Sequence, residues 1–286
     1  MAQVLPAPAL SACVGLVPAP PEPVSFGTTA AGVLRSGRPL PDRGPGWVRA
    51  RPGEPTRYGT PALLGVLERA TAEVARAFPG TAPLRIADLS SPAGGRHPRH
   101  GSHRSGRDAD LLFYVTDPAG RSRTGRGWLA YSRFGVAVER RRPGGREASG
   151  AIFLFDDARN WHLVRTLLLD EAAGVQWIFV SRGIEARLLR WAIAHEPSAD
   201  ALARAALVLH QPAHASPHDD HFHVRVLCSP RERAYGCRNR GPVWTWLRAA
   251  WDRPERAPGD GLDDAALVRE IMDPIEPARG AGPPPG

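Results

Sequence analysis

The most constraining feature of this sequence is a group of histidines at the head of an apolar, β-branched run. Residues 217–226 read Pro-His-Asp-Asp-His-Phe-His-Val-Arg-Val, which places three histidines and two aspartates within six residues. If this run is a strand, His221 and His223 project from the same face, because side chains two apart in a strand share a face. Two such imidazoles can bind one metal ion together, or one can bind the metal while the other carries protons. A histidine-rich surface loop flanking an ordinary strand is the alternative interpretation.

A second histidine-bearing segment precedes another predicted strand. His103 lies in a glycine- and histidine-rich loop, residues 91–108, which is too polar and too interrupted to be a helix. Asp110 lies at the start of the buried strand that is predicted over residues 109–115. Together with His223, these residues supply two imidazoles and one carboxylate, a typical three-ligand set for catalytic zinc that leaves a position for water.

The remaining apolar patterns predict an α+β fold. A helix is expected to begin at Thr60 as N-cap, with Pro61 in its first turn, and to end before Pro79 and Gly80. Apolar residues at helical or strand spacing predict further helices over residues 157–169, 184–195 and 199–209, and strands over residues 84–89 and 175–180. We expect a single domain with a central, mostly antiparallel sheet. Helices should pack on this sheet, with a zinc site on one of its faces.

The composition changes towards both ends of the chain. Residues 1–26 are rich in proline and alanine and are expected to be a leader remnant or linker, and residues 256–286 form a Pro/Gly-rich tail. Segment 117–149 carries arginines throughout and is expected to be an exposed excursion, with a substrate-facing basic patch as the alternative. The residues before Cys13 resemble a bacterial lipoprotein cleavage box, so Cys13 is a candidate lipid anchor.

The charge of the chain narrows the choice of partners only slightly. All 37 basic residues are arginines, and the net charge is +8. Such a charge attracts nucleic acid, an anionic membrane surface or an acidic cell-wall polymer alike. No recognition helix and no stacking aromatics are visible among the arginines, so nucleic acid is not an expected partner. No run of about 18 apolar residues occurs, so no transmembrane segment is predicted.

Four short segments resemble the motifs of the penicillin-insensitive murein endopeptidases. They are Gly94–Arg96, His100–Gly106, Asp108–Asp110 and His218–Arg225, within a similarity that extends from about Phe26 to about Trp251. This family is part of a wider group of lysostaphin-like, D-Ala-D-Ala and hedgehog-like zinc folds. The resemblance implies a zinc metallopeptidase domain over residues 27–255. It also implies hydrolysis of peptide cross-links in peptidoglycan, of the D-alanyl to meso-diaminopimelyl type, in the periplasm or another exported location.

The resemblance also implies roles for single residues. His103, Asp110 and His223 match the zinc ligands of the family. His218 and His221 match histidines that carry protons or stabilise the transition state. Zinc in such a site polarises the scissile carbonyl and lowers the pKa of bound water, and a neutral imidazole can then take up the proton. Which of the two histidines acts as the base stays open.

Several neighbouring residues are candidates for supporting roles. His100 matches a family histidine close to the metal, as a ligand or as a residue beside the ligands. One of Asp219 and Asp220 could orient an imidazole, and Asp108 shares a strand face with Asp110; simple solvation of these carboxylates is the alternative. Further along, Cys228 and Cys237 fall where family members can carry a disulfide, which supports export.

Two other functional classes fit the sequence less well. A non-catalytic zinc-fold module that binds or regulates at the cell wall is the main alternative, but every expected ligand and both candidate histidines are present. A serine hydrolase is not expected, because no Gly-x-Ser-x-Gly motif occurs.

Overall fold

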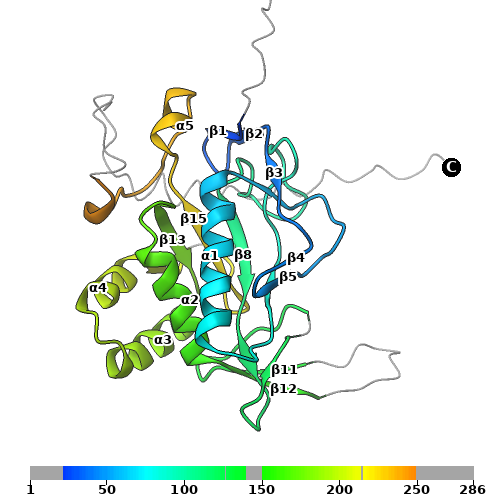
Figure 1. Ribbon diagram of the computed structural model, residues 1–286, viewed down its shortest axis with the longest axis vertical. Coiled ribbons are helices and arrows are strands. Elements are labelled where there is room, and N and C mark those ends of the chain that lie inside the picture. Colours follow the sequence, from blue (N-terminus) through cyan, green and yellow to red (C-terminus); the bar gives the residue numbers. More distant parts are fainter. Residues whose placement is uncertain (1–21, 126, 140–149, 214, 249–286) are drawn as a thin grey trace, which may run out of the picture.

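The computed structural model describes residues 22–125, 127–139, 150–213 and 215–248 (Figure 1). Most of the predicted leader, the Pro/Gly-rich tail and the candidate lipid anchor at Cys13 lie outside the described residues. The described part of the chain combines five α-helices with mixed sheets, so the predicted α+β class is confirmed.

A seven-stranded sheet runs through the centre of the fold in the order β14-β13-β15-β8-β7-β5-β4. Its strands are β4 Arg43–Gly44, β5 Trp47–Arg49, β7 Leu84–Ile86, β8 Asp108–Leu112, β13 Val175–Phe179, β14 Leu209–His210 and β15 His221–Val226. The pairs β13·β14 and β5·β7 are parallel, and the other four neighbouring pairs are antiparallel. The prediction of a mostly antiparallel central sheet is therefore confirmed.

Three smaller sheets surround the central one. Two are hairpin-like pairs, β1 (Val24–Gly27) with β2 (Gly32–Arg35) and β3 (Arg38–Pro39) with β6 (Tyr58–Gly59). The third has the order β10-β9-β12-β11, with bounds Ser122–Arg123, Val115–Thr116, Ile152–Phe155 and Val136–Val138. Because β10 and β11 belong to segment 117–149, part of that predicted excursion is built into a sheet. Residues 126 and 140–149 of the segment lie outside the described residues.

The strand predicted over residues 109–115 is divided between two sheets. Its first part is β8, and its last residue begins β9. Between them, the backbone N–H of Tyr114 donates to Asn160 Oδ1 at 3.0 Å, and Asn160 Nδ2 donates to the Tyr114 carbonyl at 2.8 Å. The side chain of Asn160 thus replaces a neighbouring strand at this point, and the chain leaves the central sheet.

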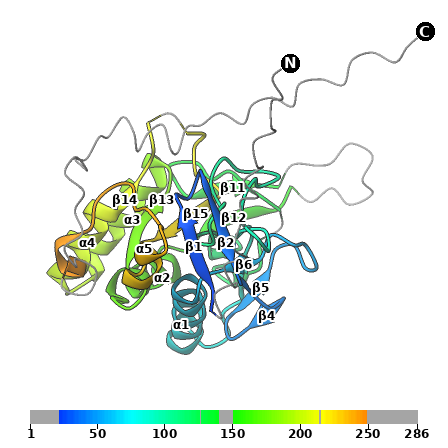
Figure 2. The same cartoon turned by 90° about the horizontal axis from the view of Figure 1, so that it is seen from above.

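Four of the five helices of the described residues begin close to where the sequence predicts them, and α5 was not predicted. They are α1 Pro61–Ala77, α2 Asp157–Leu169, α3 Arg182–His195, α4 Ala199–Val208 and α5 Pro230–Ala234, with a 3-10 turn at Thr245–Leu247. Thr60 caps α1, since its hydroxyl accepts a hydrogen bond from the Leu63 N–H. Figures 1 and 2 show α1 and α2 lying against the sheet, with α3 and α4 beyond α2. None of the helices in the described part is long and apolar enough to cross a membrane.

The two central strands separate the core from the polar face of the sheet. Side chains alternate along a strand, so Leu111 of β8 and Phe222 and Val224 of β15 point into the apolar core with α1 and α2. The intervening residues, including Asp110 and His223, point to the opposite face. The same alternation that fills the core therefore gathers the polar side chains on one face.

A disulfide joins Cys228 and Cys237 directly after β15, with Cα atoms 5.9 Å apart. The loop that it closes also contacts other parts of the fold. Cys228 N–H donates to Asn239 Oδ1 at 2.6 Å, and the buried Arg107 donates to the same oxygen at 3.3 Å. This covalent closure holds the segment after β15 against the end of the central sheet.

Candidate active site

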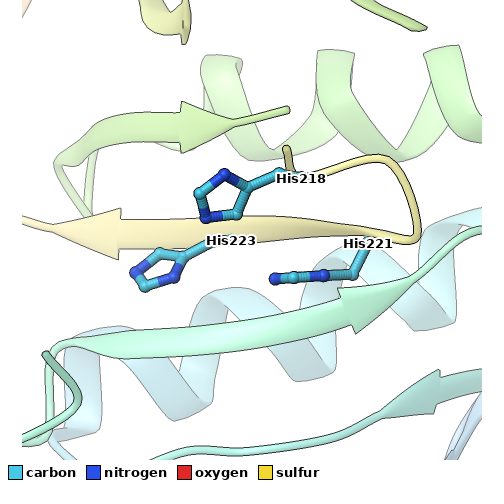
Figure 3. Close-up of side chains that lie close together, drawn as sticks. All are labelled: His218, His221 and His223. Atoms are coloured by element: carbon cyan, nitrogen blue, oxygen red, sulfur yellow. The ribbon is translucent and has the colours of Figure 1, made fainter. Parts of the chain in front are cut away.

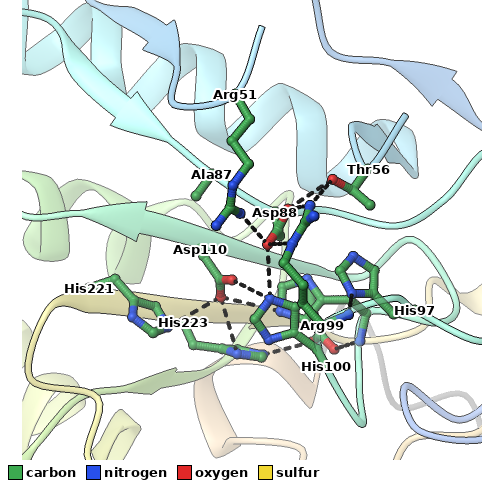
Figure 4. A network of polar contacts seen from close by, with 12 residues as sticks. Arg51, Thr56, Ala87, Asp88, His97, Arg99, His100, Asp110, His221 and His223 are labelled. Atoms are coloured by element: carbon green, nitrogen blue, oxygen red, sulfur yellow. Dashed lines mark hydrogen bonds and ion pairs between the residues drawn. The ribbon is translucent and has the colours of Figure 1, made fainter. Parts of the chain in front are cut away.

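Strands β8 and β15 bring the first group of candidate residues together. In the antiparallel ladder His223 is paired directly with Asp110, and His221 is paired with Leu112. His223 Nδ1 lies 3.4 Å from Asp110 Oδ1, and His221 Nε2 lies 3.4 Å from the same oxygen (Figure 4). One carboxylate oxygen is thus approached by both strand histidines, as side chains on one face of paired strands allow.

The glycine-rich loop supplies two more imidazoles. His103 is fully buried and its Nε2 lies 3.2 Å from Asp110 Oδ1, while His100 Nε2 lies 3.4 Å from Asp110 Oδ2. His103 has φ +62°, a left-handed conformation that is uncommon for a residue other than glycine. Its backbone N–H donates to Asp108 Oδ2 at 3.0 Å, which helps to hold that conformation. Strain of this kind is often found where a side chain must be aimed at a functional site.

The third histidine of the strand motif lies in the loop before β15. Figure 3 shows His218 next to His221 and His223, and its ring centroid is 5.2 Å from that of His221. The His218 backbone is fixed by two bonds, one from its N–H to Gln211 Oε1 and one from the Ser181 N–H to its carbonyl. One ring nitrogen from each of these three histidines lies within 4.8 Å of the other two, and the same holds for one donor atom from each of His100, His103 and Asp110.

The donor atoms around Asp110 fit a bound metal ion. Within the described part of the chain, both Asp110 oxygens and both His103 ring nitrogens are buried without a hydrogen-bond partner, an arrangement that is costly unless something else binds these atoms. Tetrahedral zinc with bonds of about 2.0–2.1 Å requires ligand atoms about 3.3–3.4 Å apart. The contacts of Asp110 Oδ1 with His103 and His223, at 3.2 and 3.4 Å, match that spacing.

The electrostatics of the cluster keep its carboxylates ionised. Burial alone would raise the pKa of Asp110, but the neighbouring rings of His103, His221 and His100 hold it well below its usual range. The pKa of His103 is raised, because the attraction of Asp110 outweighs the effect of burial. The buried charges are therefore compensated within the cluster.

The two candidate proton carriers have different surroundings. Burial and the nearby rings of His223 and His221 lower the pKa of His218 to about 3. Burial would also lower the pKa of His221, but Asp110 and Asp220 raise it to about 10. Asp220 Oδ1 contacts His221 Nδ1 at 2.5 Å, so Asp220 is the aspartate that orients this ring. Asp219 instead contributes its carbonyl, which accepts from the Tyr131 N–H at 2.8 Å.

Asp108 is paired with an arginine from β15. Arg225 Nε donates to Asp108 Oδ1 at 2.8 Å, and both side chains are buried. The other carboxylate oxygen accepts the His103 N–H, and His223 Nε2 lies 3.5 Å from Asp108 Oδ1. Asp108 therefore contacts two of the three predicted ligands, the backbone of His103 and the ring of His223.

Sequence reasoning missed Asp88, which follows β7. Its buried carboxylate accepts hydrogen bonds from Arg51, Arg99 and Thr56, and its Oδ2 lies 3.0 Å from His100 Nε2 (Figure 4). Burial raises the pKa of Asp88, but the bonds from His100, Arg99 and Thr56 hold it well below its usual range. An aspartate inside a predicted apolar strand was the available signal, because such a position is unfavourable unless the charge is paired.

Sequence reasoning also missed Trp128, which lies in the segment predicted to be an exposed excursion. Its ring meets the His221 ring edge to face, with centroids 5.1 Å apart. The Arg51 guanidinium lies over the Trp128 ring at 5.2 Å and also donates to Asp88. No local pattern indicated this contact, because it depends on how the segment folds back over the sheet.

The central sheet gathers buried histidines and a carboxylate on one face, with further histidines beside them. These side chains are compatible with a metal ion, and donor sets of this kind occur in metal-dependent hydrolases. The family model of the penicillin-insensitive murein endopeptidases matches residues 25–246. The chain belongs to this family, as its motifs predicted.

Several relatives carry the name penicillin-insensitive murein endopeptidase. The protein from Haemophilus influenzae is 28% identical over 225 residues, which are 76% of this chain and 68% of the relative. The protein from Yersinia pestis bv. Antiqua is 34% identical over 94 residues, covering 32% of this chain and 34% of the relative. The protein from Pectobacterium atrosepticum is 31% identical over 94 residues, covering 32% and 33%.

Proposed function

We propose that this protein is a zinc-dependent endopeptidase that cleaves D-alanyl to meso-diaminopimelyl cross-links in peptidoglycan. Membership of a murein endopeptidase family makes it a peptidase of the kind that hydrolyses the cell wall. The observation that supports a metal ion is the set of buried donor atoms around Asp110 that make no hydrogen bond in the described part of the chain and lie at spacings that suit tetrahedral zinc. The identity of the bond that is cut is inferred from the family resemblance alone.

His103, Asp110 and His223 are the proposed ligands. When bound, zinc would supply Lewis-acid chemistry, polarising a carbonyl and acidifying a water molecule. Burial keeps His103 and Asp110 away from solvent, so competing water is excluded from the ligand atoms. Asp108 fixes the His103 backbone, and the ladder between β8 and β15 fixes the other two residues.

His218 and His221 are the proposed proton carriers. The His218 ring lies beside those of His221 and His223, and Gln211 Oε1 accepts its backbone N–H, whereas the β8–β15 ladder places His221. Asp220 fixes the tautomer of His221, because it contacts Nδ1 and leaves Nε2 directed at the cluster. The lowered pKa of His218 leaves its ring neutral and able to accept a proton during attack on the peptide bond, whereas the raised pKa of His221 keeps its ring charged and able to donate a proton to the leaving amine.

An exported location in the cell envelope follows from this proposal, since the substrate lies there. The disulfide between Cys228 and Cys237 fits an oxidising compartment. We propose residues 27–255 as the peptidase domain, peptidoglycan as the partner, and His100 as either a fourth ligand or a hydrogen-bond partner held by Asp88.

The test is a digest of purified cross-linked muropeptide dimers, followed by chromatography. Dimers should become monomers, a chelator should stop the reaction, and added zinc should restore it. β-Lactams should have no effect, because they acylate a serine nucleophile and no acyl-enzyme is expected here. Dimers that persist with zinc-loaded protein, while the protein still binds the wall, would favour a non-catalytic binding module instead.

A further inference from the structure

An open groove lies over the junction between the β1–β2 hairpin and the glycine-rich loop. Its volume is about 410 Å³. Apolar side chains and two arginines line it, namely Phe26, Ala31, Val33, Arg96 and Arg104, together with the backbone of Gly95. The β1–β2 hairpin is at the top of Figure 1, in blue. This groove is separate from the histidine cluster and has no role in the chemistry proposed above.

The floor of the groove is held by main-chain hydrogen bonds. Leu34 N–H donates to the Ala93 carbonyl at 3.0 Å, Gly95 N–H donates to the Gly32 carbonyl at 3.2 Å, and Arg104 N–H donates to the Thr29 carbonyl at 3.0 Å. These bonds fasten the hairpin to both arms of the glycine-rich loop. A β-carbon at Gly95 would meet nothing within 4 Å, so this side of the groove is open to a ligand.

The two arginines of the groove differ from those around Asp88. Among the described residues, no carboxylate pairs with Arg96 or Arg104, whereas Arg99 is bonded to Asp88 and Glu54. Arg104 Nε is buried and donates to no acceptor in the described part of the chain. A buried donor without an acceptor is unfavourable unless a ligand supplies one. The groove therefore presents two cations beside an apolar wall.

The groove and the candidate metal site share one loop. Arg104 directly follows His103, so their Cα atoms are only about 3.8 Å apart. Arg96 directly precedes His97, whose ring centroid lies 5.4 Å from that of His103. A ligand bound in the groove would therefore contact the same loop that positions His103 beside Asp110.

We propose that this groove binds a carboxylate-bearing arm of the murein peptide, away from the bond that is cut. The inference rests on the proposed function and adds a second contact for the same substrate. Guanidinium groups recognise carboxylates through charge-assisted, often bidentate hydrogen bonds. The apolar wall formed by Phe26, Ala31 and Val33 suits the methyl groups of alanyl residues, and a diaminopimelyl residue supplies the carboxylate.

Two sets of variants test the groove. The double variant Arg96→Gln/Arg104→Gln removes both charges, and the isosteric pair Val33→Glu and Val33→Gln differs only in an added carboxylate. Val33 is exposed and lies in the groove wall, so both substitutions are compatible with the fold. Arg190→Gln, at an exposed position on α3, is the matched control for loss of positive charge.

Binding and turnover are measured separately with the zinc-loaded full chain. Calorimetry with an uncross-linked muropeptide monomer, which holds no bond to be cut, should show affinity falling about fivefold for each arginine lost. KM for the cross-linked dimer should rise by a similar factor, while kcat and bound metal stay unchanged. Val33→Glu should lose as much affinity as the double variant, Val33→Gln should lose less because it alters only the apolar wall, and Arg190→Gln should behave like the wild type.

The outcomes separate this inference from the proposed function. If the double variant and Val33→Glu bind the monomer as tightly as the wild type, with the same KM, the groove does not bind substrate. If the wild type cleaves no dimer, the proposed function fails, and the calorimetric comparison of wild type with the variants still decides the role of the groove. If Val33→Glu and Val33→Gln lose the same affinity, the positive charges of Arg96 and Arg104 do not attract the ligand, and the proposed recognition of a carboxylate is wrong.

Discussion

His223 and Asp110 are paired across the centre of the main sheet, with His223 Nδ1 3.4 Å from Asp110 Oδ1. His103 Nε2 approaches the same oxygen to 3.2 Å from a different segment of the chain. The ladder fixes two of the three proposed ligands through backbone hydrogen bonds, whereas the third depends on a loop.

Substitution of a proposed ligand should remove bound metal. His103→Ala, Asp110→Ala or His223→Ala each leaves two of the three donors, and zinc affinity should fall by at least about 100-fold, since zinc sites of this kind need three protein ligands. Metal content after dialysis, measured by mass spectrometry, checks this. His195→Ala is the control, because His195 lies exposed at the end of α3. Full zinc occupancy in all three variants would contradict the ligand assignment.

His221→Ala should retain zinc and lose activity. Loss of a proton-transfer group typically lowers kcat by about 100-fold or more. Asp220→Asn should have a smaller effect, about 10-fold, because it only weakens the contact that orients the His221 ring. Steady-state kinetics on muropeptide dimers, together with metal analysis, measure both variants. A His221→Ala protein that has lost its zinc would instead make His221 a ligand.

Arg225→Met should destabilise the fold strongly. The substitution leaves the buried Asp108 carboxylate without its arginine, and breaking a buried ion pair from one side typically costs about 3–5 kcal/mol. Urea denaturation gives the change in the free energy of unfolding. Arg76→Met, which removes the exposed pair with Glu73, should have little effect. If Arg225→Met and Arg76→Met lower the free energy of unfolding by similar amounts, the buried Asp108 carboxylate does not need Arg225 for its stability.

Loss of the disulfide should lower stability without removing the proposed metal site. Cys228→Ser/Cys237→Ser opens a loop with a sequence separation of 9, for which chain-entropy models give about 2–3 kcal/mol. Thermal unfolding with and without reductant measures the effect, and reductant should shift only the wild type. Equal melting temperatures for oxidised and reduced wild type would contradict a stabilising role.

The helix and strand positions were largely predictable because their signals are local. Thr60 and Pro61 mark the start of α1 through cap chemistry, and the alternation in residues 221–226 marks β15. Alternation also predicted which residues of β8 and β15 share the polar face. These features depend on neighbours within a few residues, which a sequence displays directly.

The surroundings of the candidate site were less predictable, because they depend on contacts between distant segments. The sequence does not indicate that Asp88 is bonded to Arg51 and Arg99, or that Trp128 packs against His221. The division of the strand at Tyr114 likewise depends on a side chain in α2. Tertiary pairing of this kind leaves no periodic pattern in the sequence.

The position of β15 has a consequence for how the chain is made. It is the last strand of the described chain, yet it lies between β13 and β8, and Arg225 and Asp108 are separated by 117 residues. During synthesis, β8 and β13 are made long before the strand that covers their facing edges. Uncovered strand edges can pair with other chains, so nascent forms of this protein are open to aggregation until β15 is inserted. Because β15 also carries His221 and His223, completion of the sheet and completion of the proposed metal site are the same late event.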